Sequence, residues 1–249
     1  MPSLGSHLAR ARQVAERLRL PEIDADRGSY YFGATAPDVR VITRLDRRIT
    51  HFYELDGYGQ QDSVARMFQE HPGLAQPAGL DAATTAFIAG YITHLVLDEC
   101  YIEEVYRRDF GQLSPIGDDP RRNVLDRVLQ YELDRLDRED RRAMDEVCTA
   151  LMACSPPEHI PFIADEHLVQ WRAVAADVAA QAPDYSRFRR MMTRHLVEAG
   201  LSEGEIDAYC EAPEEVVRDA LAHVTAARLD RFWQDAAERM HDRVRRYLR

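Results

Sequence analysis

Residues 87–99 read FIAGYITHLVLDE, an apolar run that contains a histidine and an aspartate four positions apart. Residues i and i+4 lie on one face of a helix, so we expect His94 and Asp98 side by side. Burying an ionised carboxylate is costly unless a cation, a hydrogen-bond network or a metal ion pairs with it. The spacing therefore fits either a metal site or an ordinary His–Asp hydrogen bond.

The same run contains Gly90, one helical turn before His94. Glycine inside a helix costs about 1 kcal/mol relative to alanine, which suggests that a packing requirement keeps it there. We expect another backbone to approach the helix closely at this point. A tight helix crossing without any chemistry would explain the glycine equally well.

Most of the remaining chain has helical periodicity. Apolar residues at spacings of three and four predict an amphipathic helix at 4–19, and Asp81 is a good N-cap for a long helix that runs to about residue 108. The pattern predicts further helices at 24–35, 119–136, 138–153, 164–181, 185–199 and 213–247. We therefore expect an all-α fold, a multi-helix bundle.

Two segments do not fit the helical pattern. VRVIT, residues 39–43, is the one short run with β-like character, and residues 53–80 are expected to form a long loop, either functional or a plain surface connection. We expect one helical domain over 1–249, with the site in 1–110 and a scaffold or lid in 111–249. Residues 125–140 could pair with a helix of a second copy, giving a homodimer, although covering the core of their own chain is the simpler role.

Composition and charge exclude several classes of function. The net charge of −11 argues against sequence-independent binding to nucleic acid and to anionic membranes. All 32 basic residues are arginine, which excludes Schiff-base lysine chemistry and a Walker-type phosphate loop. The chain shows no signal-like apolar segment, no stable membrane anchor and four scattered cysteines, so we expect a cytoplasmic protein with free thiols.

Five side chains in the first hundred residues are candidate metal ligands: His7, Asp38, His51, His94 and Asp98. Each has an ordinary alternative: Asp38 follows a proline and can cap a turn, and a lone histidine is often a core or surface residue. Together they offer three imidazoles and two carboxylates, the donor set of a zinc-type or two-metal site. The surplus over one closed tetrahedral ion favours a bridging carboxylate or open positions.

These residues lie in the stretches MPSLGSHLARA, YYFGATAPDV, ITHFYE and AGYITHLVLDE, within residues 1–99. Their order resembles the zinc-dependent phospholipase C family, whose all-helical fold is shared by S1/P1-type nucleases. The resemblance implies that all five residues bind Zn²⁺, as one or two ions. It implies that Asp98 bridges, with His51, His94 and Asp38 on one ion and His7 on the other.

The resemblance departs from the family after Asp98. The better-known members have a further histidine there, whereas this chain has none until His159, so we do not expect a third metal ion. In such enzymes a metal-bound hydroxide attacks phosphorus. We therefore expect a metal-dependent hydrolase, a phosphodiesterase or phosphatase, that acts on a small molecule and uses Asp38 and Asp98 in catalysis.

Other residues near these stretches are candidates for binding the substrate. Arginines 40, 44, 47 and 48 form a local basic cluster, and arginine binds phosphate well. We expect Arg40 and Arg48 to bind substrate, with Tyr31 and Tyr53 shaping the pocket. Two alternatives remain open: an iron-dependent oxidoreductase on the same ligands, with iron or manganese in place of zinc, and a non-catalytic helical protein with a structural metal.

Overall fold

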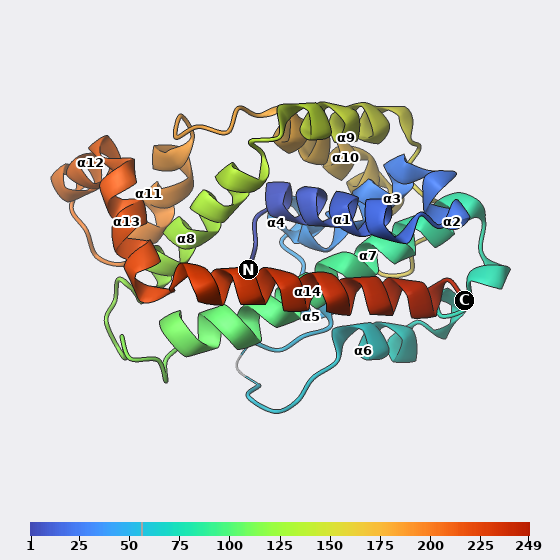
Figure 1. The fold of residues 1–249 in the computed structure, drawn as a ribbon, viewed down its shortest axis with the longest axis horizontal. Helices are drawn as coiled ribbons and strands as arrows, with labels where there is room; N and C mark the ends of the chain where they lie inside the picture. The colour runs from blue at the N-terminus through green and yellow to red at the C-terminus, as the bar shows by residue number, and fades with distance from the viewer. Residues whose placement is uncertain (56) are drawn as a thin grey trace.

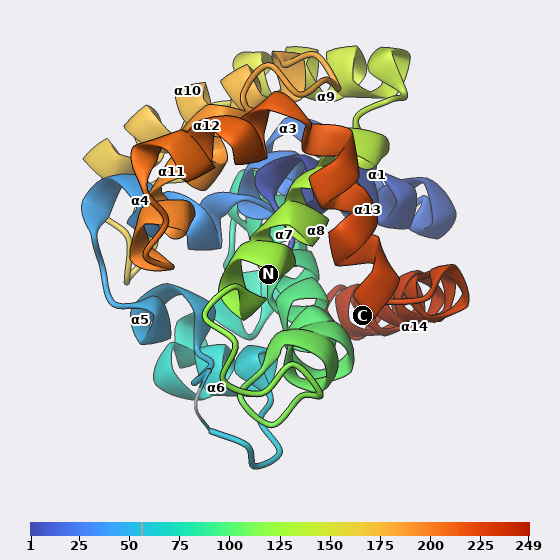
Figure 2. The same ribbon diagram turned by 90° about the vertical axis from the view of Figure 1, so that its left-hand side faces the viewer.

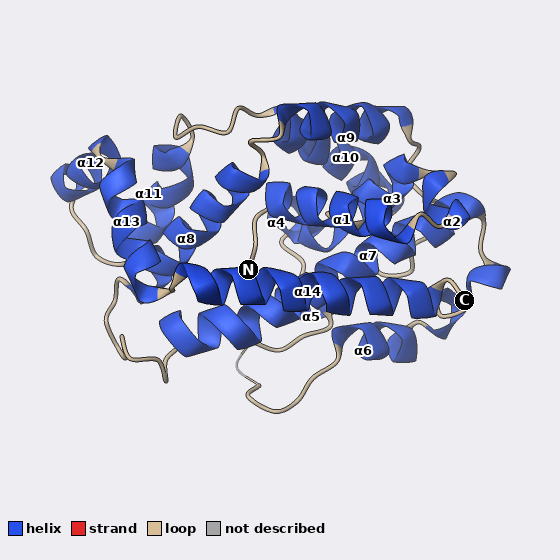
Figure 3. Cartoon of the chain, in the orientation of Figure 1, coloured by secondary structure: helices blue, strands red, loops and turns tan. Residues whose placement is uncertain are grey.

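The computed structural model describes residues 1–55 and 57–249, and all regular elements of this part of the chain are helices (Figures 1 and 3). The α-helices are α1 (Leu4–Leu18), α2 (Pro21–Asp24), α3 (Arg27–Gly33), α4 (Arg40–Thr43), α5 (Arg47–His51), α6 (Ser63–Glu70), α7 (Ala82–Tyr101), α8 (Arg122–Asp137), α9 (Arg141–Ala153), α10 (Asp165–Ala180), α11 (Phe188–Glu198), α12 (Glu203–Glu211), α13 (Pro213–His223) and α14 (Ala226–Tyr247). The 3₁₀ helices η1 (Ala36–Val39), η2 (Pro72–Leu74) and η3 (Pro77–Gly79) and the π-helix η4 (Ile102–Phe110) complete the set. The predicted all-α class is confirmed.

Helix α7 is the centre of the molecule. Its N-cap is Asp81, as predicted, and the carboxylate accepts a hydrogen bond of 2.7 Å from the backbone N–H of Thr84. Every residue from Thr84 to Tyr101 is buried, because α3 and α14 cover opposite parts of the helix. In Figure 1, α14 runs across the front of the molecule and α7 lies behind it. A helix that is apolar all round must be enclosed in this way.

The backbones of α3 and α7 touch where they cross. A Cβ atom at Gly90 would lie 1.8 Å from the carbonyl oxygen of Tyr30, and one at Gly33 would lie 1.9 Å from that of Phe87. Real Cβ atoms almost never come within 3.0 Å of another heavy atom, so each helix needs glycine at the crossing. The close approach predicted at Gly90 is confirmed, and it brings the end of α3 against α7.

The second half of the chain packs around this pair. Helices α9 and α10 lie side by side, with α9 against α3, and α8, α11, α12 and α13 lie toward one end of the molecule (Figures 1 and 2). The indole N–H of Trp171 in α10 donates a 2.9 Å hydrogen bond to the carbonyl of Thr35, which ties α10 to the chain just before Asp38. Buried apolar residues form one continuous core from Leu8 to Tyr247.

Several predicted boundaries are wrong. The run 39–43 is helical, because its residues continue η1 into the short helix α4. The predicted loop 53–80 is described except at residue 56, and it contains α6, whose N-cap Asp62 accepts from the backbone of Ala65 at 2.9 Å. The predicted helix 24–35 is shorter, Arg27–Gly33, and starts after the N-cap Asp26.

Two further differences occur near the C-terminus. The predicted helix 213–247 is two helices, α13 and α14, because Val224 and Thr225 are extended and Val224 is buried. Helix α12 was not predicted; it begins at a capping box in which Ser202 and Glu205 bond reciprocally. No helix of the described residues is sufficiently long and apolar to cross a lipid bilayer.

Candidate metal centre

The structure brings the five candidate ligands into one cluster. His7 lies near the start of α1, Asp38 in η1, His51 at the end of α5, and His94 and Asp98 one turn apart on α7. The Nε2 atom of His7 is 3.4 Å from Oδ1 of Asp98, and Nε2 of His51 is 3.4 Å from Oδ2 of Asp98 and from Oδ1 of Asp38. The Nε2 atom of His94 is 3.7 Å from Oδ2 of Asp98.

These distances suit a divalent cation. With bonds of about 2.1 Å to a tetrahedral ion, two ligand atoms lie about 3.4 Å apart. In each of two overlapping groups the donor atoms all lie within 4.8 Å of one another, so small movements would bring them to this separation. One group is His7, His94 and Asp98, and the other is Asp38, His51 and His94.

Partners of the Nδ1 atoms fix the ring orientations of two histidines. Nδ1 of His94 donates a 2.8 Å hydrogen bond to the carbonyl of Ala34, and Nδ1 of His51 lies 2.9 Å from the hydroxyl of Thr50. In each ring the opposite atom, Nε2, is buried and has no hydrogen-bond partner among the described residues. Metal-ligating histidines have this arrangement, in which one nitrogen is held by an outer partner and the other is left for the ion.

His7 completes the set in a different way. Its ring stacks on that of His94 with centroids 3.6 Å apart, and neither of its nitrogens has a hydrogen-bond partner in the described part of the chain. The Oδ1 atom of Asp98 is likewise buried and unpartnered. Buried polar atoms without partners are uncommon and need an explanation such as a missing ion or water. A cation between His7 and Asp98 would provide it.

Burial and charge set the protonation of these groups. Burial and the neighbouring His7 lower the pKa of His94 to about 3, and burial and the nearby Arg47 lower the pKa of His51. Burial raises the pKa of Asp98, but His94, His7 and Arg47 outweigh it and hold that pKa well below its usual range. At neutral pH these imidazoles are neutral and the carboxylate is ionised, the states that bind metal.

Asp38 differs from the other four ligands in its exposure. Its side chain is 17% exposed, whereas those of His51 and Asp98 are 1% and 4% exposed. Burial raises its pKa, but contacts with His51 and His94 more than offset this and lower the pKa below the usual range. Asp38 is therefore an ionised carboxylate at the side of the cluster that solvent can reach.

Arg47 also enters the cluster, although only its neighbours Arg40 and Arg48 were expected to bind substrate. Its side chain is 10% exposed, and Nη2 donates a 2.8 Å hydrogen bond to Oδ2 of Asp98. Arg47 and His51 are one turn apart on α5, so the same helix face presents both to Asp98. Arg47 was not singled out from the sequence; its spacing of four residues from His51, in RRITH, is the signal that could have done so.

The other predicted substrate residues have different surroundings. Arg48 is exposed, and its guanidinium pairs with Asp46 at 2.9 Å. Tyr31 is buried beside Arg27, and the hydroxyl of Tyr53 donates to Glu103 at 3.4 Å. The described contacts join none of these three predicted residues to the cluster. Arg40 is half-buried two residues after Asp38, with Nε unpartnered among the described residues, and its role stays a prediction.

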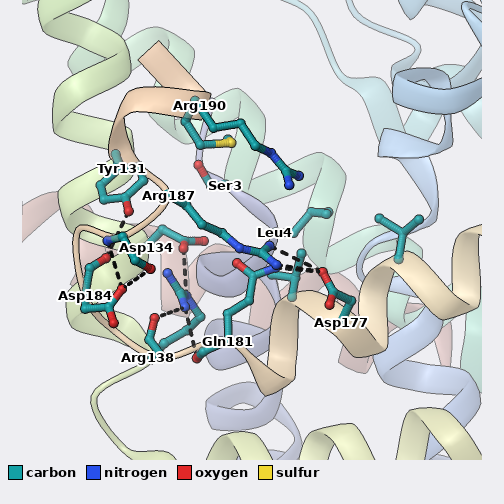
Figure 4. A pocket seen from close by; sticks show the side chains of 15 residues that line it. Ser3, Leu4, Tyr131, Asp134, Arg138, Asp177, Gln181, Asp184, Arg187 and Arg190 are labelled. Carbon is teal, nitrogen blue, oxygen red and sulfur yellow. Dashed lines mark hydrogen bonds and ion pairs between the residues drawn. The ribbon is translucent and has the colours of Figure 1, made fainter. Parts of the chain in front are cut away.

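Two cavities lie outside the cluster. One, of about 350 Å³, lies between the start of α1 and helices α8 and α10 (Figure 4). No cluster residue is among the described residues that line it, and several of its charges are paired, as in the Arg138–Asp134 bond of 2.8 Å. The other, of about 310 Å³, is lined partly by Ile102, whose backbone N–H donates to the carbonyl of Asp98. This second cavity therefore lies one helical turn from the cluster.

The comparisons with known proteins gave no match. No family model matched the chain, no curated protein matched it, and no solved structure matched it. The donor atoms of the cluster indicate which ions it could bind. Three imidazoles and two carboxylates suit zinc, iron or manganese.

Proposed function

We propose that the chain is a metal-dependent hydrolase that acts on a small phosphoester. The observation that carries the proposal is the set of five converging donors, in which Nε2 of His51, Nε2 of His94 and Oδ1 of Asp98 are buried without partners in the described part of the chain. The resemblance of the ligand-bearing stretches to zinc-dependent phospholipase C supports the choice of substrate. Only 17% of the Asp38 side chain is exposed, which supports a small molecule rather than a macromolecule as the substrate.

The chain's own residues would divide the work as follows. His51, His94 and Asp98 would hold the cation, which would supply Lewis acidity toward a phosphoryl oxygen and lower the pKa of water. Asp38 is ionised and faces solvent, so it accepts a hydrogen bond from an approaching water and orients it. The lowered pKa of Asp38 makes it a weak base, so it is better suited to orient the water than to act as a general base.

The two oxygens of Asp98 face different histidines, which supports a bridging position. Oδ1 is nearest to His7, and Oδ2 is nearest to His51 and His94. His94 belongs to both possible donor groups. The centre can therefore be built around one ion, with a second ion possible only where His7 and Oδ1 of Asp98 provide ligands.

The test is to measure metal content and turnover in the same preparations. Purified protein should contain about one zinc, iron or manganese ion per chain, and His94→Gln should lose it because the ring reaches both donor groups. The matched control is His223→Gln, a substitution of an exposed histidine on α13, which should keep the metal. Hydrolysis of bis-p-nitrophenyl phosphate should require the metal and disappear in His94→Gln only.

Other results would direct the function elsewhere. Metal content that is equal in the wild type and His94→Gln would refute the site. Bound iron that reacts with oxygen, without hydrolysis of any phosphoester, would favour an oxidoreductase. Stoichiometric metal that raises the melting temperature without any turnover would leave a structural metal site.

A further inference from the structure

We propose that Arg47 is the anion-binding residue of this site and holds an oxygen of the phosphoester beside the cation. The inference rests on the proposed function for the identity of the anion. It concerns a side chain that the metal cluster does not need as a ligand, because arginine is a cation and cannot bind metal.

Arg47 has donors to spare inside the protein. Only Nη2 is accounted for, by its 2.8 Å hydrogen bond to Oδ2 of Asp98. Nε and Nη1 are buried and have no hydrogen-bond partner among the described residues, and these two atoms carry most of the N–H groups of a guanidinium. Guanidinium groups with free N–H donors are well suited to bind the oxygens of phosphate.

The bond to Asp98 also places these donors beside the metal ligands. Oδ2 of Asp98 is 3.4 Å from Nε2 of His51, so the guanidinium and the candidate ligands share one carboxylate oxygen. An anion that reaches the cluster past Asp38 would meet the cation and Arg47 together. Asp98 thus serves as a positioning residue for the arginine as well as a ligand.

Charge balance supports an anionic ligand. The two carboxylates, Asp38 and Asp98, exceed the single positive charge of Arg47 by one when the imidazoles are neutral. One divalent cation reverses this excess and leaves one positive charge, which a phosphodiester or a phosphate monoanion would neutralise. A second divalent cation would leave three positive charges in a nearly closed site, so Arg47 favours a centre with one ion and one bound anion.

The test is calorimetric titration of inorganic phosphate into zinc-loaded protein from which free zinc has been removed. Arg47→Gln should weaken phosphate binding at least tenfold while the zinc content is retained. The matched control is Arg142→Gln, which removes the same charge from α9, where the side chain is 91% exposed and pairs with Glu146. The control should bind phosphate within twofold of the wild type.

Each result decides between the two proposals. If zinc binds but Arg47→Gln binds phosphate as tightly as the wild type, the role of Arg47 is refuted and the hydrolase proposal survives. If no variant binds metal, the hydrolase proposal fails, and the same titration on metal-free protein decides whether Arg47 binds phosphate by itself. Should Arg47→Gln fail to fold, nitrogen NMR of the wild type decides: phosphate should shift the Arg47 Nε signal, and an unshifted signal refutes the inference.

Discussion

Replacing Gly90 by alanine should both destabilise the protein and weaken its hold on metal. The new Cβ atom would lie 1.8 Å from the carbonyl oxygen of Tyr30, against a practical limit of 3.0 Å, so α3 must move away from α7 by about 1.2 Å. Overpacking of this kind costs about 1–3 kcal/mol, and better helix propensity returns about 1 kcal/mol. Because the clash is with backbone, we expect a net loss of about 2 kcal/mol, or about 4–8 °C in melting temperature.

The effect on metal follows from the same movement. The carbonyl of Ala34, at the end of α3, accepts the 2.8 Å hydrogen bond that orients His94, and a shift of about 1.2 Å breaks it. Loss of such an outer partner weakens metal binding about 10–100-fold. Gly204→Ala is the control: Gly204 is near the start of α12 with no atom within 4 Å of an added Cβ, so its stability should be unchanged or slightly higher.

Differential scanning calorimetry and a competitive zinc titration with a chromophoric chelator measure the two effects. Wild-type melting temperature and wild-type zinc affinity in Gly90→Ala would show that the helix crossing does not position His94. A lower melting temperature with unchanged zinc affinity would separate the fold from the site and refute the second step alone.

Three other perturbations test the electrostatics and packing around the cluster. Asp98→Asn should abolish metal binding and lower the free energy of unfolding by about 3 kcal/mol, because the buried guanidinium of Arg47 loses its counter-charge. The double variant Asp98→Asn/Arg47→Gln should regain most of the stability but should not bind metal. Urea unfolding and metal analysis measure the two effects. In metal-free protein His94 stays neutral when folded down to about pH 3 but takes up a proton near pH 6.5 when unfolded. The free energy of unfolding should therefore fall as the pH drops from about 6.5 to 4, by about 1.4 kcal/mol per pH unit for this group. Urea titrations should show a smaller dependence on pH in His94→Gln. The same pH dependence in the variant and the wild type would contradict the prediction. Trp171→Phe should cost about 1–3 kcal/mol, because the smaller ring leaves a cavity at a fully buried position and the carbonyl of Thr35 keeps only the hydrogen bond from the backbone N–H of Asp38 among its described donors. An unchanged urea midpoint would rule this out.

The sequence was sufficient where local spacing determines geometry. His94 and Asp98 share a face because any helix places residues i and i+4 together. Gly90 indicated a helix crossing because glycine destabilises a helix interior unless close packing requires it. The long apolar run and the N-cap Asp81 together identified the central helix. These features depend on interactions within one element, so they can be read without knowing the partners of that element.

Features that depend on how one helix is oriented relative to the next could not be predicted in the same way. The residues that follow α4 and α5, Arg44 and Phe52, both have positive φ, although neither is a residue that usually adopts this conformation. On α5, between these two turns, the side chain of Arg47 is buried and that of Arg48 is exposed. A run of arginines therefore contained one buried side chain, and the sequence pattern alone did not distinguish it from its exposed neighbours.

The uneven burial of the cluster bears on how an ion would come and go. The side chains of His7, His51 and His94 are at most 1% exposed, and that of Asp38 is the most accessible of the five. An ion held there would exchange with solvent past Asp38 or through local opening of the short helix α5. Exchange by these routes alone would be slower than from an open site, so the metal recovered with the protein would depend partly on which ion was available while the chain was folding.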